Sequence, residues 1–291
     1  MQILITGAGT LLGNSLAKYL AKKNFSLICT YRNTFPSNLK GIKNIKLIHF
    51  DMAKKITFSK KFNILVHCAS AIPDYNCSKN YYNKVNVVGF KNLLDLCVKN
   101  KCNNIILIST MSVYGKINVK KISEKYKGKK FDDYGASKKK MEEMLKKFTF
   151  KNNISSTTLR LSAILGKNSK HNFISNIFQK LKNKEQINVF NPNLKFNNIV
   201  HVSNLCEIIY KSLLNKGFLV LNVASKYPVK ISNLIDMMIK YIYPKQEILL
   251  VKYLDNNKGF NINTKKILRK KYNLYSTKET LKRFVKDNLN T

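Results

Sequence analysis

The chain has 291 residues, of which 44% are hydrophobic, enough for one large α/β domain or for a large domain with a smaller one attached. It carries 53 basic and 15 acidic residues, which give a formal net charge of +38. No apolar run approaches the ~20 residues that a membrane-spanning helix requires, and the six cysteines lack the Cys-x-x-Cys spacing typical of a structural metal site.

The charge comes almost entirely from lysine, because only four of the 53 basic residues are arginine. Tryptophan is absent while asparagine and isoleucine are abundant, a profile typical of AT-biased coding. Sites that recognise nucleic-acid bases favour arginine, whose planar fork matches base edges. We therefore interpret the lysines as a solvated surface with weak, non-specific affinity for polyanions. The cysteine usage, together with a strand pattern that begins at Gln2 and leaves no room for a signal peptide, predicts a reduced cytoplasmic protein.

Short apolar runs alternate with amphipathic runs over the first part of the chain. β-like runs lie at 2–6, 26–31, 45–50, 62–69, 104–110 and 155–161, and helical patterns at 12–23, 82–99 and 135–148. This alternation predicts an α/β fold with a Rossmann-like, doubly wound parallel sheet. We expect residues 1–165 to form a dinucleotide-binding domain.

The pattern is looser over residues 166–291. Helices are expected at 172–183, 203–214, 231–241 and 277–287, and strands at 187–190 and 218–223. These elements predict a smaller α/β substrate-binding region that is partly interleaved with the sheet. The lysine-rich stretch 116–130 has no clear periodicity and is predicted to be a loop.

A glycine-rich loop follows the first predicted strand. The strand ends at Thr6 and is followed by Gly7, Gly9 and Gly13 and an amphipathic helix. Glycines there permit a tight turn, close approach of a pyrophosphate and close packing of helix on strand, while the helix N-terminus favours phosphate. An ordinary turn is the alternative, but the position at the first strand of a βαβ pattern favours dinucleotide binding. The residues expected to contact the cofactor here are Gly7, Gly9, Thr10, Leu11, Leu12 and Gly13.

The end of the second predicted strand carries Arg32 and no acidic residue. A site for NAD usually has Asp or Glu here to accept a hydrogen bond from the ribose 2′-hydroxyl, whereas an arginine suits a 2′-phosphate. A solvated cation at a strand end is the alternative. We expect NADP to be preferred, with NAD as the second choice.

Tyr134 and Lys138 are four residues apart at the start of a predicted helix, so they share one face of it. A tyrosine has an ordinary pKa of about 10, and a nearby ammonium together with a nicotinamide cation favours the phenolate. Such a tyrosine exchanges a proton with a substrate oxygen while a hydride moves at carbon. Tyr-x-x-x-Lys spacing also arises by chance in so lysine-rich a chain, and the position just after the fifth predicted strand distinguishes this pair.

The fifth predicted strand, 104–110, ends in Ser109 and Thr110. Ligands of open α/β sheets lie beyond the carboxyl ends of the strands. A hydroxyl at this position either hydrogen-bonds the reacting oxygen or only caps a turn.

Taken together, these segments resemble the extended short-chain dehydrogenase/reductase family, of the NAD-dependent epimerase/dehydratase type, over nearly the whole chain. The resemblance is carried by Thr6–Gly13, Asp51, His67–Ala71, Asn86–Gly89, Ser109–Gly115, Tyr134–Lys138, Leu159–Leu161, Leu165–Gly166 and Val200–Val202. It implies that Thr110 orients the substrate oxygen, that Tyr134 is the acid–base, and that Lys138 binds the nicotinamide ribose. It also implies a homodimer formed through the helices at 82–99 and 135–148.

The resemblance implies further cofactor contacts. Asp51 and Met52 would face the adenine, Ala69, Ser70 and Ala71 would line the cofactor, and Asn86 would support the site from the fourth helix. Structural roles for Asp51, as a turn cap, and for Asn86, as a polar helix residue, are the alternatives.

Three departures from the family pattern bear on function. Thr10 stands where the family has its middle glycine. Met111 and Ser112 replace the acidic pair that follows the Thr in sugar dehydratases, which argues against dehydration. Asn197 and Asn198 replace an Arg-Asp pair common in epimerases that bind nucleotide diphosphates.

The sequence leaves two classes of function open. One is an NAD(P)-dependent sugar oxidoreductase, a 4-keto-sugar reductase or an epimerase acting on a nucleotide-linked sugar in surface polysaccharide synthesis. The other is a non-enzymatic protein of the same fold that binds RNA or another polyanion through its basic surface. We favour the enzyme, because Thr110, Tyr134 and Lys138 are all present.

Overall fold

The computed structural model describes residues 1–54, 58–73, 77–244, 251–254 and 259–289, which fall into two compact units. Unit 1 comprises residues 1–117, 126–160 and 206–221, and unit 2 comprises 118–125, 161–205 and 222–291. The chain therefore passes between the units several times. This division differs from the contiguous boundary expected at residue 165, because 206–221 belongs to the first unit and 118–125 to the second.

Unit 1 is built on a seven-stranded sheet of order β12-β7-β5-β4-β1-β2-β3. The last two residues of β12 belong to unit 2. The strands are β1 (Gln2–Thr6), β2 (Ser26–Tyr31), β3 (Ile45–His49), β4 (Ile64–His67), β5 (Asn104–Thr110), β7 (Ser155–Leu161) and β12 (Phe218–Val223). The pairs β1–β2, β2–β3, β1–β4 and β4–β5 are all parallel. This is the doubly wound Rossmann-like sheet that the alternating pattern predicts, so the predicted fold class is confirmed.

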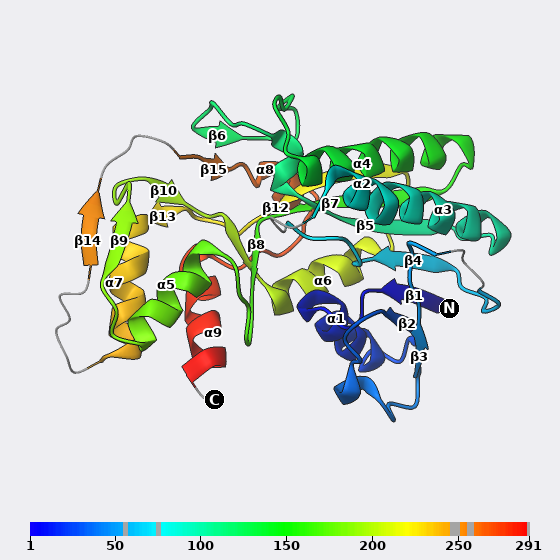
Figure 1. Ribbon diagram of the computed structural model, residues 1–291, viewed down its shortest axis with the longest axis horizontal. Coiled ribbons are helices and arrows are strands. Elements are labelled where there is room, and N and C mark those ends of the chain that lie inside the picture. Colours follow the sequence, from blue (N-terminus) through cyan, green and yellow to red (C-terminus); the bar gives the residue numbers. More distant parts are fainter. Residues whose placement is uncertain (55–57, 74–76, 245–250, 255–258, 290–291) are drawn as a thin grey trace. The chain divides into compact units, whose positions relative to one another are not determined.

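Helices cover both faces of this sheet. They are α1 (Leu11–Ala21), η1 (Ser37–Leu39), α2 (Lys79–Tyr82), η2 (Asn83–Val88), α3 (Gly89–Lys99), η3 (Met111–Tyr114), α4 (Asp133–Lys151) and α6 (Val202–Ser212). Figure 1 shows α2, α3 and α4 on one side of the strands and α1 and α6 on the other. Strands such as β1 and β4 are buried along nearly their whole length, which explains their continuous apolar sequences.

The helix expected over 82–99 is three segments in the structure. A four-residue α-helix, α2, leads into the π-helical segment η2, and α3 follows. The π segment contains Asn86, whose side chain is fully buried. Single π-helical turns widen a helix locally and occur often at functional sites.

Unit 2 has its own α/β core. Its elements are β6 (Lys121–Ile122), β8 (Ala163–Leu165), α5 (Phe173–Lys182), β9 (Ile187–Phe190), β10 (Lys195–Phe196), β11 (Ile199–His201), β13 (Val229–Lys230), α7 (Ile231–Ile242), β14 (Val251–Leu254), β15 (Asn261–Ile262), α8 (Lys265–Arg269) and α9 (Thr277–Leu289). The amphipathic helices α5, α7 and α9 pack their apolar faces into one cluster, in which the rings of Phe178 and Phe284 lie edge to face at 5.2 Å. Part of the lysine-rich stretch 116–130 is a strand, because β6 pairs with β15.

Asn197 replaces a family position that the sequence analysis linked to diphosphate binding, and the structure gives it a different task. Its Nδ2 donates to the carbonyl oxygens of Ser225 (3.0 Å) and Ile262 (2.9 Å), and its Oδ1 accepts from the amide of Ile262 (2.8 Å). The side chain is fully buried. Asn197 therefore cross-links three segments of unit 2.

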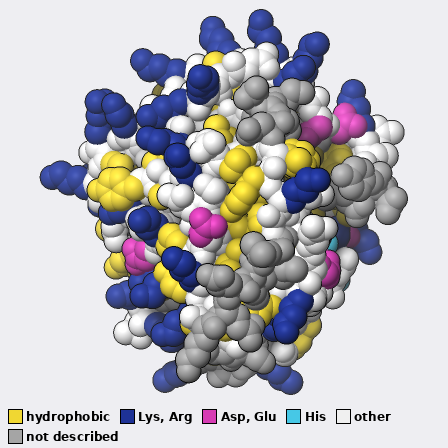
Figure 2. Space-filling model, turned by 90° about the vertical axis from the view of Figure 1, so that its left-hand side faces the viewer, with side chains coloured by type: hydrophobic (Ala, Val, Ile, Leu, Met, Phe, Trp, Pro, Cys, Tyr) yellow, Lys and Arg dark blue, Asp and Glu magenta, His cyan; other side chains and the backbone are white. Residues whose placement is uncertain are grey.

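Within the described ranges, no helix is both long enough and apolar enough to cross a membrane. Nor do three or more His, Cys, Asp or Glu side chains come together there as a metal site would require. Basic side chains are dispersed over the face of the molecule drawn in Figure 2 and do not gather in one patch there.

Candidate active site

The glycine-rich loop after β1 is held by close backbone contacts. Gly7 has φ +79°, a conformation that L side chains rarely adopt. A Cβ at Gly9 would collide with the carbonyl oxygen of Thr34, and one at Gly13 with the carbonyl oxygen of Gly7. The loop therefore presents bare backbone at the start of α1, as a pyrophosphate site requires.

Thr10 is the N-cap of α1. Its backbone is extended, with φ −92° and ψ 161°, and its Oγ1 accepts from the amide of Gly13 at 3.1 Å while donating to the carbonyl of Gly7 at 2.8 Å. Because this conformation is open to any residue, the position has no geometric need for glycine. At this position the chain therefore has a threonine that caps α1 where the family has glycine.

A pocket of about 180 Å³ lies in unit 1 at the carboxyl ends of β1, β2 and β4 and beyond β3. Among the residues that line it are nine of those expected to bind the cofactor: Gly7, Gly9, Thr10, Arg32, Asp51, Met52, Ala69, Ser70 and Ala71. Leu11, Leu12 and Gly13 lie behind the loop in α1, and Asn86, Tyr134 and Lys138 are likewise not part of the lining. Four of the six segments that the sequence analysis assigned to the cofactor site therefore line one cavity.

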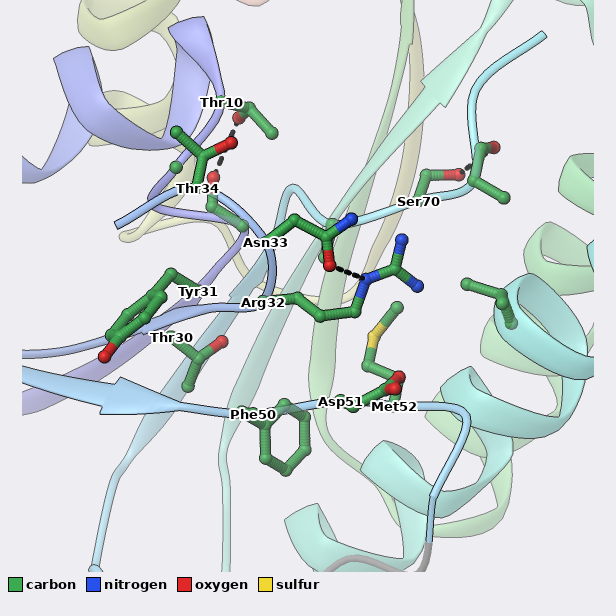
Figure 3. Close-up of a pocket in the computed structure, with 15 residues that line it drawn as sticks. Thr10, Thr30, Tyr31, Arg32, Asn33, Thr34, Phe50, Asp51, Met52 and Ser70 are labelled. Carbon is green, nitrogen blue, oxygen red and sulfur yellow. Dashed lines mark hydrogen bonds between the residues drawn. The ribbon is translucent and has the colours of Figure 1, made fainter. Parts of the chain in front are cut away.

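Arg32 extends across this pocket, with Asn33 on one side and Asp51 and Met52 on the other (Figure 3). Its Nε donates to Asn33 Oδ1 at 3.1 Å, and both terminal nitrogens donate to the hydroxyl of Tyr81 at 3.2 Å. Three N–H bonds thus fix the plane of the guanidinium. Within the described part of the chain, the other two N–H groups of the guanidinium make no hydrogen bond.

Asp51 lies two residues beyond the end of β3 and caps the turn that follows, because its Oδ1 accepts from the amide of Ala53 at 2.9 Å. Met52 beside it is buried. Both line the pocket, so Asp51 caps the turn, the role weighed as the alternative, and also borders the cavity.

Asn86 holds the loop after β4. Its Oδ1 accepts from Ser70 Oγ (3.0 Å) and the Ala71 amide (2.8 Å), and its Nδ2 donates to the Ala71 carbonyl (3.2 Å) and Ser137 Oγ (2.9 Å). All its hydrogen-bonding capacity is therefore spent inside the protein. Asn86 acts on the pocket through Ser70 and Ala71, and it ties that loop to α4 through Ser137.

Thr110 and Tyr134 meet at the end of β5. Thr110 Oγ1 accepts from the amide of Ser112 at 3.2 Å and caps η3, so the turn-capping role weighed in the sequence analysis is real. Burial raises the pKa of Tyr134 to about 12, and a hydrogen bond with Thr110 lowers that pKa in part. The Tyr82 ring lies 6.0 Å away. The expected lowering by Lys138 does not contribute, and in the nucleotide-free protein Tyr134 is a protonated phenol.

Lys138 is almost completely buried, at 2% exposure, and its Nζ donates to the carbonyl oxygen of Ile108 at 2.7 Å. Burial lowers its pKa to about 8, and the Glu142 carboxylate one turn further along α4 acts in the opposite direction. The Lys138 ammonium therefore bonds the end of β5, and it is not among the groups that shift the pKa of Tyr134.

Several lining residues were missed by the sequence analysis. They are Thr30, Tyr31, Asn33, Thr34, Phe50 and Val85. Most of them immediately follow or end β2 and β3, so the rule that ligands lie beyond the carboxyl ends of strands would have found them. Tyr81 carried no signal, because nothing in the sequence relates it to Arg32.

A family model described as the NAD dependent epimerase/dehydratase family matches residues 3–224, which is most of the chain. The chain belongs to this family. The match begins in β1 and runs through β12, so it includes the glycine loop, the pocket and the Tyr134–Lys138 pair. The resemblance identified from the motifs is thereby confirmed.

Three curated relatives are similar to this chain, and two of them are named as sugar 4-epimerases. A putative UDP-glucose 4-epimerase of Methanocaldococcus jannaschii is 26% identical over 250 residues, covering 81% of each chain. Protein CapI of Staphylococcus aureus is 26% identical over 227 residues, covering 72% of this chain and 68% of its own. An N-acetyl-α-D-glucosaminyl-diphospho-ditrans,octacis-undecaprenol 4-epimerase of Escherichia coli O157:H7 is 28% identical over 178 residues, covering 60% and 53%.

Solved structures agree on the fold. A UDP-Glc/GlcNAc 4-epimerase of Campylobacter jejuni superposes with a TM-score of 0.84 at 17% identity, over 100% of this chain and 99% of that one. A UDP-glucuronic acid 4-epimerase of Bacillus cereus in complex with NAD gives 0.81 at 19% identity, covering 98% of each chain. At these identities the likeness shows the epimerase fold of this family member and leaves its substrate open.

Proposed function

We propose that this family member is an NAD(P)-dependent enzyme that reduces or epimerises a nucleotide-linked sugar at its 4-position, in the synthesis of a surface polysaccharide. The observation that carries the proposal is the convergence of the glycine loop and the ends of β2 to β4 on one pocket, in the same unit as the Thr110–Tyr134 pair. The three relatives named as 4-epimerases of sugars support the position of the reaction.

The residues of the pocket fit a dinucleotide. The backbone at Gly7, Gly9 and Gly13 has no space for a Cβ, so a pyrophosphate could approach this loop closely. Asp51 and Met52 would border the adenine, and Lys138 would bind the nicotinamide ribose. Bound there, the cofactor supplies a carbon that accepts or donates a hydride.

Tyr134 would exchange the proton that accompanies this hydride. It is partly buried beside Thr110, which would donate a hydrogen bond to the same sugar oxygen. Because burial raises the pKa of Tyr134 to about 12, the phenol needs a positive charge close by before it releases its proton easily. A nicotinamide cation would provide that charge once the site is filled.

We further propose that NADP is preferred over NAD. Arg32 stands where an acidic residue would accept from a ribose 2′-hydroxyl, and Asn33 and Tyr81 hold its guanidinium in a fixed plane. A pre-oriented guanidinium suits a 2′-phosphate, because charge-assisted bonds gain strength from fixed geometry.

Fluorescence titration with NADPH and NADH tests the cofactor. We expect NADPH to bind at least about tenfold more tightly than NADH, and Arg32→Ala to abolish the difference, which corresponds to about 1.4 kcal/mol. Arg269→Ala, an exposed arginine of α8, is the matched control and should change neither affinity. Tight NAD binding that is indifferent to Arg32→Ala refutes the role of Arg32 and favours an epimerase that retains its cofactor.

Product analysis with UDP- and dTDP-linked 4-keto and 4-hydroxy sugars tests the reaction. A reductase consumes one NADPH per product, whereas an epimerase forms the 4-epimer without net change in the cofactor. Tyr134→Phe should lower either rate by about two to four orders of magnitude, the range for loss of a general acid–base. Conversion that is unaffected by Tyr134→Phe contradicts the assignment.

A homodimer and a cytoplasmic site of action are also proposed. Apolar side chains are exposed on the helices expected at the interface: Val88 is 46% exposed, Val98 53% and Phe150 65%. Light scattering on wild type and Val98→Asp tests this, and a monomer in both contradicts it. The six cysteines are all free, as expected in a reducing compartment.

The net charge of +38 favours a second candidate function, binding of RNA or another polyanion without catalysis. Nucleic acid that remains bound through a high-salt wash, in a protein that binds neither NADPH nor NADH, would support it.

A further inference from the structure

Three successive residues at the end of β5 lie beside three residues of α4 spaced four apart, and two of the three pairs are hydrogen-bonded. The Ile108 carbonyl accepts from Lys138 Nζ at 2.7 Å, and Ser109 Oγ donates to Glu142 Oε1 at 2.5 Å. Thr110, the next residue, lies close enough to Tyr134 to lower its pKa. Residues four apart lie on one face of a helix, so the end of the strand is bonded along two turns of α4.

Glu142 is in turn fixed by Arg160 of β7. The Arg160 Nε lies 3.1 Å from both carboxylate oxygens of Glu142, and Nη2 donates to Oε2 at 2.7 Å. The third nitrogen, Nη1, donates to the hydroxyl of Tyr114 at 2.9 Å, in the turn that follows Thr110. Both members of this ion pair are buried.

We propose that Ser109, Glu142 and Arg160 are positioning residues that set the separation between Thr110 and Tyr134. The proposal rests on the acid–base role proposed for Tyr134. Ser109 is the neighbour of Thr110 and Glu142 lies two turns from Tyr134 on α4, so a bond between them fixes strand end and helix in one register. Arg160 and Tyr114 keep the carboxylate from turning away.

A buried ion pair is a poor means of gaining stability, because the desolvation of two charges offsets their attraction and apolar residues of similar volume often serve as well. Its directional bonds do hold groups in defined places, as a reacting pair requires. Glu142 has a second effect, since its charge opposes the lowering of the Lys138 pKa by burial. The ion pair therefore helps to fix the positions of Thr110 and Tyr134, and its Glu142 carboxylate favours the charged form of Lys138.

The other end of α4 supplies a matched comparison. Ser156 Oγ lies 2.6 Å from Thr149 Oγ1, whose own hydrogen is donated to the Leu145 carbonyl, so the Ser156 hydroxyl donates to a side chain of α4 as Ser109 does. Both serines are buried, at 3% and 0% exposure. Thr149 lies 15 residues beyond Tyr134, or about 22 Å along the helix.

The experiment compares Ser109→Ala with Ser156→Ala. Each removes one buried hydroxyl that bonds α4 and leaves the Glu142–Arg160 pair intact, which avoids the unfolding expected from an isolated buried charge. The readout is the ¹³Cζ chemical shift of Tyr134 in protein labelled at tyrosine, assigned by its loss in Tyr134→Phe. We expect Ser109→Ala to move this resonance and Ser156→Ala to leave it in place, although both lower the urea midpoint to a similar extent.

Kinetics give the second readout. With a substrate found as described above, Ser109→Ala should lower kcat about tenfold with KM within about twofold, because a displaced acid–base affects the reacting state more than binding. Ser156→Ala should leave both constants within about twofold. If Tyr134 does not respond to Ser109→Ala, or responds equally to both, the positioning role is refuted. If the resonance moves as expected but no sugar is converted by the wild type, the proposed function fails while the coupling of Ser109 to Tyr134 stands.

Discussion

Replacing Lys138 by Met removes an ammonium that the fold buries at 2% exposure. Methionine has a similar length and no charge, so it fills the same space among the side chains of α4 and β5. We expect Lys138→Met to stabilise the nucleotide-free protein while it weakens cofactor binding. Groups that serve a site often cost stability in this way.

The magnitude follows from the pKa of Lys138, which burial lowers from 10.5 to about 8. That shift makes the buried charge unfavourable by about 3 kcal/mol near neutral pH, at about 1.4 kcal/mol per pKa unit. Loss of the hydrogen bond to the Ile108 carbonyl returns about 1 kcal/mol. The net gain in the free energy of unfolding is thus about 2 kcal/mol at about pH 7.

The gain depends on pH with a defined sign. Between about pH 8 and 10.5 the unfolded chain holds the Lys138 proton and the folded protein releases it, so this group makes the wild type more stable as pH rises. At about pH 9.5 the cost of burying the Lys138 charge has fallen to about 1.4 kcal/mol. The increase in the free energy of unfolding from Lys138→Met is then less than about 0.5 kcal/mol.

Urea unfolding of the nucleotide-free variants, followed by circular dichroism at both pH values, measures this difference. Lys140→Met changes an exposed lysine of the same helix and should stay within about 0.5 kcal/mol of the wild type. A Lys138→Met protein that is less stable than the wild type near neutral pH, or whose advantage is the same at both pH values, would show that the ammonium is not desolvated.

Three further substitutions test the pocket. Gly9→Ala places a Cβ against the Thr34 carbonyl, and we expect a loss above about 1 kcal/mol and weaker NAD(P)H binding, measured by urea unfolding and fluorescence titration; unchanged binding contradicts the close approach. Thr10→Ala should cost about 1 kcal/mol through the lost cap with nucleotide affinity retained, and a large drop in affinity would show a direct role for the hydroxyl. Asn86→Leu removes four buried hydrogen bonds and should cost about 3 kcal/mol and weaken binding, whereas a cost below about 1 kcal/mol refutes its cross-linking role.

The first half of the fold was predictable because its strands are buried on both faces and appear as continuous apolar runs. The run at 62–69, for example, contains β4, Ile64–His67. The π segment 83–88 was not predictable, because the periodicity of 82–99 is the same whether or not one turn is widened to place Asn86 against the loop after β4. In unit 2, β15 pairs with β6 at positions 140 residues apart, as Asn261 does with Lys121, and no local pattern encodes such a pairing.

The site was predictable where backbone geometry dictates the residue type. Gly7 and Gly13 are examples, since neither position accepts a Cβ without strain or collision. Tyr81 was not found, because it reaches Arg32 from α2, 49 residues further along the chain, and nothing in the sequence relates the two. Glu142 was not found either, since charged residues on a lysine-rich helix are expected on its solvated face.

Helix α4 shows why these omissions are related. Its buried residues are Gly135, Ser137, Lys138, Met141, Glu142, Leu145 and Thr149, so much of the face turned to the core is polar. A helix selected only for stability would place apolar side chains there. The increase in the free energy of unfolding expected for Lys138→Met is the stability that the polar residue at position 138 costs. Local rules of patterning are broken mainly where a side chain has a further task. On α4 the buried polar side chains of Ser137, Lys138 and Glu142 each bond a group beside the pocket or the proposed reacting pair. Thr149, at the far end of the helix, is the exception, so its partner Ser156 is the informative control.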